Sequence, residues 1–239
     1  MTFQADLFAG KTALVTGATQ GIGAAVANRL ASLGARTIAA GLRSDADELD
    51  AGIEVRIGDV SRAGDVEQLL QGVDALDIVV NCAGIIRRGA EHDPAVFEQV
   101  LAINLTGTMR VCSAARARLA RRGGCIVNTA SMLSFFGGSL VPAYAASKGG
   151  VAQLTKSLAL AYAADGIRVN AVAPGWIATP LTRALQNDPA RSGPILARTP
   201  LGRWGKPQDV ADGVAFLCAP AAAFMTGVIL PVDGGYLVA

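Results

Sequence analysis

A regular alternation of two kinds of segment constrains this 239-residue chain more than any other feature. Short runs of β-branched and apolar residues recur along it, and stretches with helical patterning separate them. Strands that alternate with helices form βαβ units, whose strands are parallel and covered on both faces. The pattern therefore predicts an α/β fold with a doubly wound parallel sheet. Strands are expected at 11–17, 36–41, 53–60, 76–84, 124–131, 167–175 and 227–235, and helices at 22–35, near 45–51, at 66–73, 94–120, from about 142 to 164, and at 207–220.

The chain shows no sign of a division into parts. It has no internal repeat, low-complexity tract or linker, so we expect residues 1–239 to form a single domain of about seven strands. Residues 177–206 are loop-rich and basic, and a long segment of this kind is typical of a lid beside a binding site.

Charge and composition argue against several classes of protein. No apolar run approaches the ~20 residues of a membrane helix, and the first residues lack the pattern of a secretory signal. A net charge of +2 gives no electrostatic footprint for nucleic acid. The four cysteines form no C-x-x-C pair and lie among apolar residues, which indicates reduced thiols and a cytoplasmic protein. The single histidine, His92, leaves too few ligands for a metal site.

The first predicted strand runs directly into a glycine-rich turn, TGATQGIG, which opens the first helix. Gly17, Gly21 and Gly23 permit a tight turn and close approach of the backbone, and a helix N-terminus offers free N–H groups and a positive dipole. Such a sequence can be merely a turn, but its place at the first strand–helix junction favours a Rossmann-like pyrophosphate site.

Tyr144 and Lys148 are four residues apart in an Ala-, Ser- and Gly-rich stretch, so in a helix they share one face. A surface helix with a half-buried Tyr is the ordinary interpretation of this spacing taken alone. A lysine ammonium about 4 Å from the hydroxyl at an effective dielectric of ~20 contributes on the order of 4 kcal/mol. Before desolvation is subtracted, this lowers the pKa of a tyrosine by roughly three units, which suits a general acid/base.

Several motifs in order resemble those of the short-chain dehydrogenase/reductase family, over residues 10–235. They are TGATQGIG, GDV at 58–60, NCAG at 81–84, INLTG around Asn104, Ser131 before YAASK, and PGWIAT at 174–179. NCAG departs from the family's N-N-A-G, because Cys82 replaces an Asn. The resemblance implies an oxidoreductase that moves a hydride between a nicotinamide coenzyme and a secondary alcohol or ketone. It implies coenzyme contacts at Gly17, Thr19, Gln20, Gly21, Ile22, Gly23, Arg43, Asp59, Val60, Asn81, Ala83, Gly84, Tyr144, Lys148, Pro174, Gly175, Ile177 and Thr179.

Four residues are the catalytic candidates. Tyr144 is expected to be the acid/base, and Ser131, at the end of a strand, to hydrogen-bond the substrate oxygen. By resemblance, Lys148 also binds the nicotinamide ribose, and Asn104 holds a water in a proton relay.

The choice between NAD(H) and NADP(H) stays open. NAD-dependent Rossmann enzymes usually offer a carboxylate after the second strand, whereas this chain has Gly41, Leu42 and Arg43 there. Arg43 could pair with a 2′-phosphate, but Thr19 and Gln20 stand where a second basic residue often lies.

Arginines near the predicted site favour an anionic substrate. Arg87, Met132, Trp176 and Arg183 are the candidate substrate residues. The wider cluster comprises Arg88, Arg191, Arg198 and Arg203, and Phe135, Phe136 and Leu140 are expected to line the pocket. The segments SMLSFFGGSLVPAYAASKGGV and TPLGRWGKP resemble the sugar-acid branch of the family, so a sugar acid or polyol is the first expectation.

Two alternatives remain. The first is reduction of 3-oxoacyl groups on an acyl carrier protein, for which Arg116, Arg118, Arg121 and Arg122 would be the docking surface. The second is a non-catalytic dinucleotide-binding regulator, which the intact Ser131, Tyr144 and Lys148 disfavour. By resemblance, the helices at 94–120 and 145–163 and the apolar tail at 236–238 imply a homotetramer.

Overall fold

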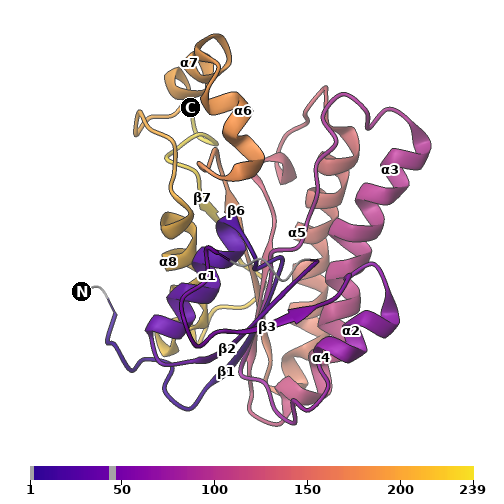
Figure 1. Ribbon diagram of the computed structural model, residues 1–239, viewed down its shortest axis with the longest axis vertical. Coiled ribbons are helices and arrows are strands. Elements are labelled where there is room, and N and C mark those ends of the chain that lie inside the picture. The colour runs from indigo at the N-terminus through magenta and orange to yellow at the C-terminus, as the bar shows by residue number, and fades with distance from the viewer. Residues whose placement is uncertain (1–2, 43–46) are drawn as a thin grey trace.

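The computed structural model describes residues 3–42 and 47–239. Within these ranges the strands form one parallel sheet in the order β3-β2-β1-β4-β5-β6-β7. The predicted fold class, a Rossmann-like doubly wound α/β sheet with helices on both faces, is confirmed (Figure 1). The strands are β1 Thr12–Thr16, β2 Arg36–Gly41, β3 Glu54–Ile57, β4 Ile78–Asn81, β5 Cys125–Thr129, β6 Arg168–Pro174 and β7 Ile229–Val232.

Helices cover the two faces of this sheet. On one side α1 packs against α8, and on the other lie α2, α4 and α5, with α3 beside α5 (Figure 1). The α-helices are α1 Gly21–Ser32, α2 Ala63–Leu69, α3 Pro94–Leu101, α4 Thr108–Ala120, α5 Pro142–Tyr162, α6 Arg183–Gln186, α7 Pro189–Ala197 and α8 Pro207–Cys218. None of the helices in the described ranges is long and apolar enough to cross a membrane.

The apolar strands have two buried faces, which explains their continuous hydrophobic sequences. In β1, Ala13 and Val15 belong to the core under α1 and α8, whereas Leu14 points into the core under α2, α4 and α5. Successive side chains of a strand point to opposite faces, so one short strand contributes to both cores.

Three predicted elements differ from the structure. The helix expected near 45–51 is wrong for the described part, because residues 47–51 form turns. The Asn28 side chain binds the carbonyl of Glu48 at 2.8 Å and the N–H of Asp50 at 3.0 Å, and so holds this segment against α1. The helix expected at 94–120 is continuous but contains a π-helical segment, Ala102–Gly107, between α3 and α4. The stretch 177–206 is more helical than expected, since it contains α6 and α7.

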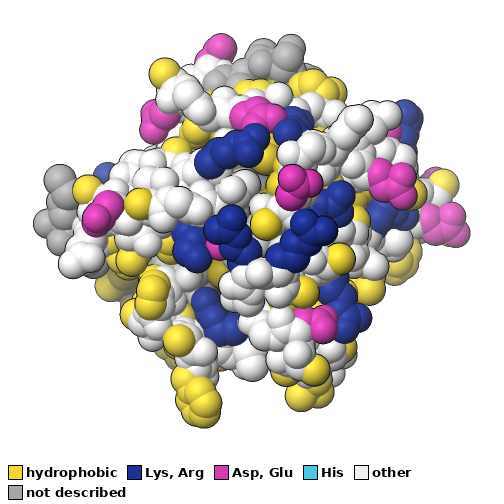
Figure 2. Space-filling view, turned by 90° about the horizontal axis from the view of Figure 1, so that it is seen from below, with side chains coloured by type: hydrophobic (Ala, Val, Ile, Leu, Met, Phe, Trp, Pro, Cys, Tyr) yellow, Lys and Arg dark blue, Asp and Glu magenta, His cyan; other side chains and the backbone are white. Residues whose placement is uncertain are grey.

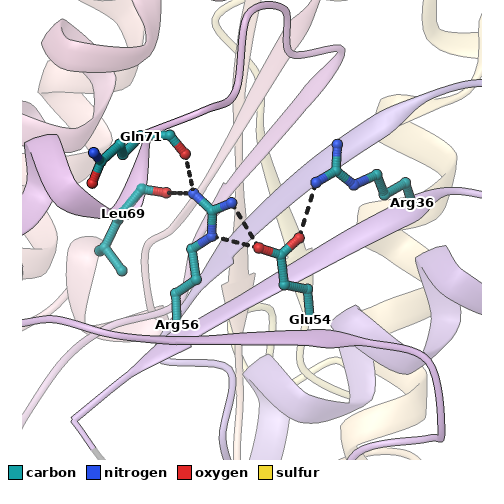
Figure 3. A network of polar contacts seen from close by, with 5 residues as sticks. All are labelled: Arg36, Glu54, Arg56, Leu69 and Gln71. Carbon is teal, nitrogen blue, oxygen red and sulfur yellow. Dashed lines mark hydrogen bonds and ion pairs between the residues drawn. The ribbon is translucent and has the colours of Figure 1, made fainter.

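The edge strand β3 is tied down by an ionic network (Figure 3). Glu54 binds Arg56 at 2.6 Å and Arg36 of the neighbouring β2 at 3.0 Å. Arg56 also donates to the carbonyls of Leu69 and Gln71, each at 2.8 Å. The network therefore connects β2, β3 and the end of α2, and the arginines lower the pKa of Glu54.

Candidate active site

The strand order reverses at the boundary between β1 and β4, because the chain runs from β1 outward to β3 and then returns to the other side. Ligands of open α/β sheets bind beyond the carboxyl ends of the strands at such a switch point. The segments that follow β1, β4, β5 and β6, where most of the predicted site residues lie, all begin at this edge.

The glycine turn after β1 has the shape that the sequence predicts. Gly17 and Gly21 have φ of +62° and +60°, in the left-handed region that glycine tolerates. A Cβ on Gly17 would approach the backbone of Ala83 to 2.6 Å. Position 17 therefore has to remain without a side chain for β1 and the end of β4 to lie this close.

The same turn accepts an anion. No side chain caps the start of α1, and the N–H of Gly21 donates to the Glu48 carboxylate at 2.7 Å. A carboxylate oxygen thus occupies the position that suits a phosphate oxygen, so the residues of the turn fit a dinucleotide pyrophosphate.

The other candidate coenzyme residues surround this turn or follow the neighbouring strands. Thr19 packs over Gly41 at the end of β2. Asp59, after β3, caps its own turn through the N–H of Ser61 at 2.8 Å. Arg43 lies outside the described residues. The remaining candidates are Gln20, Ile22 and Gly23 in the turn and first helix, Val60 after β3, Ala83 and Gly84 after β4, and Pro174, Gly175, Ile177 and Thr179 at and after the end of β6.

Asn81 is engaged inside the protein. Its amide donates to Asn128 Oδ1 at 2.9 Å, and Asn128 donates to Thr155 Oγ1 at 3.0 Å. All three side chains are buried. This chain of hydrogen bonds links β4, β5 and α5 beneath the site, and because buried polar groups need partners, it fixes their relative positions.

Lys148 lies one helical turn after Tyr144 on α5, as predicted. It is only 4% exposed, and its Nζ donates to the carbonyl of Thr129, at the end of β5, at 2.6 Å. Burial lowers the pKa of Lys148 to about 8. Its Nζ is 5.5 Å from the centroid of the Tyr144 ring.

The pKa of Tyr144 moves in the opposite direction to the sequence-based argument. Burial raises it, a hydrogen bond with Ser131 lowers it, and the negative charge of Glu91 adds to the increase. Desolvation disfavours the charged form of any acid. In the free protein it therefore outweighs the favourable neighbours, and a lowered tyrosine pKa needs further positive charge at the site.

Ser131 follows β5 and is 6% exposed. Its hydroxyl accepts from the N–H of Leu133 at 3.1 Å, and its own N–H donates to Ser134 Oγ at 3.2 Å. Ser134 in turn donates to the carbonyl of Lys148 at 2.7 Å. This loop therefore joins the end of β5 to α5 and brings the Ser131 hydroxyl to Tyr144.

Asn104 sits in the π-helical segment and is fully buried. Its side chain accepts from the N–H of Ile85 at 2.8 Å and donates to Ser147 Oγ at 3.0 Å. The widened π turn, a feature often found at functional sites, thus connects the segment after β4 with α5. The four catalytic candidates come together from three separate regions of the chain.

Glu91 is a site residue that the sequence analysis missed. It is 1% exposed, and its carboxylate accepts from the N–H groups of Arg87 and Tyr144, each at 2.8 Å. Because α5 has no other side-chain cap, Glu91 satisfies the start of the helix that carries Tyr144. Nothing in the polar stretch GAEHDP distinguishes this acid from an exposed loop residue.

The segment at 177–206 packs through aromatic side chains. The Trp176 ring meets Trp204 and Tyr236 edge-on at 5.9 and 6.4 Å, and the Arg198 guanidinium stacks on Phe136 and Tyr236. Within the part of the chain that the structure describes, Trp176 Nε1 is buried without a hydrogen-bond partner.

The arginine candidates differ in their surroundings. Arg88 lies near Arg191. Burial and the like charge of Arg191 lower the pKa of Arg88, and the negative charge of Glu91 raises it. Arg203 is paired with Asp209 at 2.7 Å. Arg87 and Arg183 are exposed, Met132 is buried, and Phe135 and Leu140 are about half exposed.

A buried lysine and its neighbouring tyrosine, together with an anion-accepting turn at the switch point of a doubly wound sheet, fit a dinucleotide-dependent oxidoreductase. A family model described as enoyl-(acyl carrier protein) reductase matches residues 17–237. The chain belongs to the short-chain dehydrogenase/reductase family, and is an NAD(P)-dependent enzyme acting on CH–OH groups.

Individual relatives fall into more than one branch. A 2-dehydro-3-deoxy-D-gluconate 5-dehydrogenase of Bacillus subtilis is 42% identical, over 95% of each chain. The 3-oxoacyl-[acyl-carrier-protein] reductase of Escherichia coli is 39% identical, over 95% of this chain and 98% of that one. An Agrobacterium tumefaciens structure provisionally assigned as a 2-deoxy-D-gluconate 3-dehydrogenase, with bound NADP, is 41% identical. It superposes with a TM-score of 0.92 and covers 99% of this chain and 100% of its own.

Proposed function

We propose that this enzyme transfers a hydride between a nicotinamide coenzyme and a secondary alcohol or ketone of a sugar acid or related polyol. The observation that carries the proposal is the meeting of Ser131, Tyr144, Lys148 and Asn104, from three regions of the chain, beside the glycine turn.

The chain's own residues manage the proton and the substrate oxygen. The nicotinamide, when bound, supplies or accepts the hydride. The Tyr144 hydroxyl gives its proton to the substrate oxygen during reduction and takes it back during oxidation. Ser131 hydrogen-bonds the same oxygen and holds it in line with Tyr144. The positive charge of Lys148 favours the tyrosinate, and Asn104 orients the water through which the proton reaches solvent.

The coenzyme contacts are those of the glycine turn and of the segments after β3, β4 and β6. Within the described residues, the end of β2 offers Gly41 and Leu42 to the adenosine ribose, and neither carries a carboxylate. Both NAD and NADP therefore remain in the proposal.

The arginines between β4 and α7 support an anionic substrate. The positive charge of Arg191 lowers the pKa of Arg88, and the negative charge of Glu91 acts in the opposite direction. A substrate carboxylate there would relieve this repulsion. Trp176 Nε1 is buried and has no hydrogen-bond partner among the described residues, so its N–H would donate to a substrate hydroxyl once the covering residues move to admit the substrate. In this proposal, Arg87, Met132 and Arg183 complete the substrate site and residues 177–206 cover it.

The second candidate function is the reduction of 3-oxoacyl groups on an acyl carrier protein. Of the four arginines expected to dock the carrier, Arg116 is bound to Asp165 at 2.6 Å and stacked on Tyr162. Arg118 donates to the carbonyl of Val73 at 2.8 Å and to that of Ala114 at 3.1 Å. These internal contacts leave less of the charge available to an acidic partner. A non-catalytic dinucleotide-binding regulator is the third candidate function, because it would not need Ser131, Tyr144 and Lys148 to be kept together.

We further propose a cytoplasmic homotetramer. Leu160 on α5, Phe224 after α8 and Val238 in the tail are 84%, 105% and 90% exposed, and large apolar side chains of this kind commonly mark subunit contacts. A monomer in light scattering at micromolar concentration would contradict this state.

The test follows the absorbance of reduced nicotinamide. NAD and NADP are each offered with hexonates, keto-sugar acids, polyols and acetoacetyl thioesters, and Tyr144→Phe serves as the blank. Turnover of a sugar acid or polyol that disappears in the variant supports the proposal. Turnover of thioesters alone moves the enzyme to the carrier-protein branch, and coenzyme binding without any turnover supports the regulator.

A further inference from the structure

A second group of reactive side chains lies at the opposite edge of the sheet. Cys125 is the first residue of β5, and Cys218 is the last residue of α8. Both line a cavity of about 220 Å³ at the amino ends of the strands. Lys11, Asp77, Arg122 and Arg168 contribute to its wall. Figure 2 looks onto this lower face, where Lys and Arg side chains gather.

The two cysteines belong to the same part of the core and to the wall of the same cavity, although they are 93 positions apart in the sequence. Each thiol also affects the pKa of the other. Their exposed fractions are 4% and 8%, against 0% for Cys112. The cavity thus gives a small solute access to two neighbouring cysteines, whereas Cys82 and Cys112 do not line it.

The surrounding charges make the pair unequal. The hydrogen bond from Cys218 lowers the pKa of Cys125, and the positive charges of Arg168 and Lys11 act in the same direction, against burial and Asp77. The pKa of Cys218 is raised by the same hydrogen bond and by burial. Thiolates are the reactive form of cysteine, and positive surroundings favour them. The charges of Lys11 and Arg168 beside it make Cys125 the candidate for the attacking sulfur, with Cys218 as its partner.

We propose that Cys125 and Cys218 form a site of reversible oxidation, in which a small peroxide admitted by the lower cavity joins them in a disulfide. The bond ties the end of α8 to the start of β5.

The chemistry takes two steps and balances with one hydrogen peroxide. The Cys125 thiolate attacks one peroxide oxygen, so that an S–O bond forms, the O–O bond breaks, and hydroxide leaves to become water. The Cys218 sulfur then attacks the Cys125 sulfur as its proton is lost. The S–S bond forms, the S–O bond breaks, and the departing hydroxide takes up that proton as a second water. The two thiols lose two electrons, and the peroxide gains them.

The disulfide would act on stability rather than on the chemistry of the active site. It lies at the amino end of β5, whereas Ser131 follows the carboxyl end. The loop that it closes contains α5, β6, residues 177–206 and α8, and a covalent link across a long loop restricts the unfolded chain. Oxidation is therefore expected to raise the melting temperature.

The test uses the reduced full-length protein under native conditions. Hydrogen peroxide is added, free thiols are alkylated, and peptides are mapped by mass spectrometry. We expect a Cys125–Cys218 disulfide, the loss of two hydrogen atoms per chain, and a melting temperature higher by several degrees. A thiol reductant should reverse all three changes.

Two variants separate this site from the remaining cysteines. In Cys218→Ser the disulfide cannot form, so the sulfenic acid on Cys125 should accumulate and be trapped by dimedone. In Cys112→Ser, the matched control, the disulfide should form as in the parent protein. If a variant fails to fold, the peptide map of the oxidised wild-type protein by itself tests whether the Cys125–Cys218 disulfide forms. Oxidation directed to Cys82 or Cys112, or a disulfide that appears only in denaturant, would overturn the proposal.

Discussion

The catalytic group and the segment at 177–206 are held in different ways. Asn104, Lys148 and Ser131 are at most 6% exposed, and contacts between residues far apart in the chain fix them, such as that of Glu91 with the N–H of Tyr144. The segment at 177–206 has many short-range bonds, such as Thr182 to the carbonyl of Ile177 at 2.6 Å and Gln186 to Thr182 at 2.8 Å. Its long-range contacts include the stacking of Arg198 on Tyr236 and the bond of the Leu201 N–H to the carbonyl of Gly234 at 3.1 Å.

This difference suggests that the catalytic group determines the rate of turnover and that the segment at 177–206 determines which substrate is preferred. A group bound to several elements of the sheet cannot shift without disturbing the core, whereas side chains of a segment with many local bonds can be replaced with less effect on the sheet. Changes in the catalytic group should therefore reduce turnover for every substrate, and changes in the lid should alter which substrate is preferred.

The largest effect is expected for Tyr144→Phe. Removing the hydroxyl removes the proposed general acid/base, a role that contributes about 10²–10⁴-fold, so kcat should fall by about 10³-fold. Coenzyme affinity and melting temperature should stay near those of the parent. Tyr162→Phe makes the same change at the far end of α5 and should retain activity. Equal loss of activity in both variants would mean that the helix, rather than the hydroxyl, is responsible.

Glu91→Gln should have the next largest effect. One of the two backbone N–H groups loses its acceptor, which costs about 1–3 kcal/mol and lowers the melting temperature. Glu91 raises the pKa of Tyr144, so removing its charge should lower that pKa. Alcohol oxidation, which needs the tyrosinate, should then extend to lower pH. Glu98→Gln on the exposed side of α3 is the control, and an unchanged pH profile in Glu91→Gln would contradict the positioning role.

A pair of matched substitutions tests Trp176 and its neighbour Trp204 in the proposed lid. Trp176→Phe removes an N–H without a partner in the described residues, so KM for a hydroxylated substrate should rise about tenfold with little change in stability. Trp204→Phe instead breaks the 2.9 Å bond to Ser192 and should cost about 1 kcal/mol of stability. If the two variants behave alike, Trp176 is a packing residue and not a substrate contact.

The smallest effect is expected at the edge strand, away from both regions. Glu54→Gln breaks the ion pairs with Arg36 and Arg56 but leaves the bonds of Arg56 to the carbonyls of Leu69 and Gln71 in place. Because Glu54 is 39% exposed, the loss should be only a few tenths of a kcal/mol. Because Arg56 lowers the pKa of Glu54, the ion pair stabilises the fold above the unfolded-state pKa of Glu54. That contribution disappears as the pH falls through the folded-state pKa. Thermal melts of both proteins should therefore converge in acid, and a constant difference would contradict this account.

Much of the fold was accessible from local patterns. The apolar runs that became β1, β4 and β5 have two buried faces, and this produces an uninterrupted hydrophobic signal. The Tyr144–Lys148 spacing predicted one shared helical face because helix geometry is periodic. The helix expected near 45–51 is wrong over the described residues 47–51 for the opposite reason, since a distant side chain, Asn28, binds the backbone of Glu48 and Asp50 and holds them in turns.

What only the tertiary structure decided depends on neighbours from elsewhere in the chain. The direction of the shift in the pKa of Tyr144 follows from burial and from Glu91. The presence of Cys125 and Cys218 in the wall of one cavity follows from the packing of α8 beside β5. The sequence by itself determined the alternating strands and helices, the glycine turn and the spacing of the catalytic helix, because these are encoded in the periodicity of adjacent residues. Desolvation and charge act through space, so their balance exists only once the chain is folded.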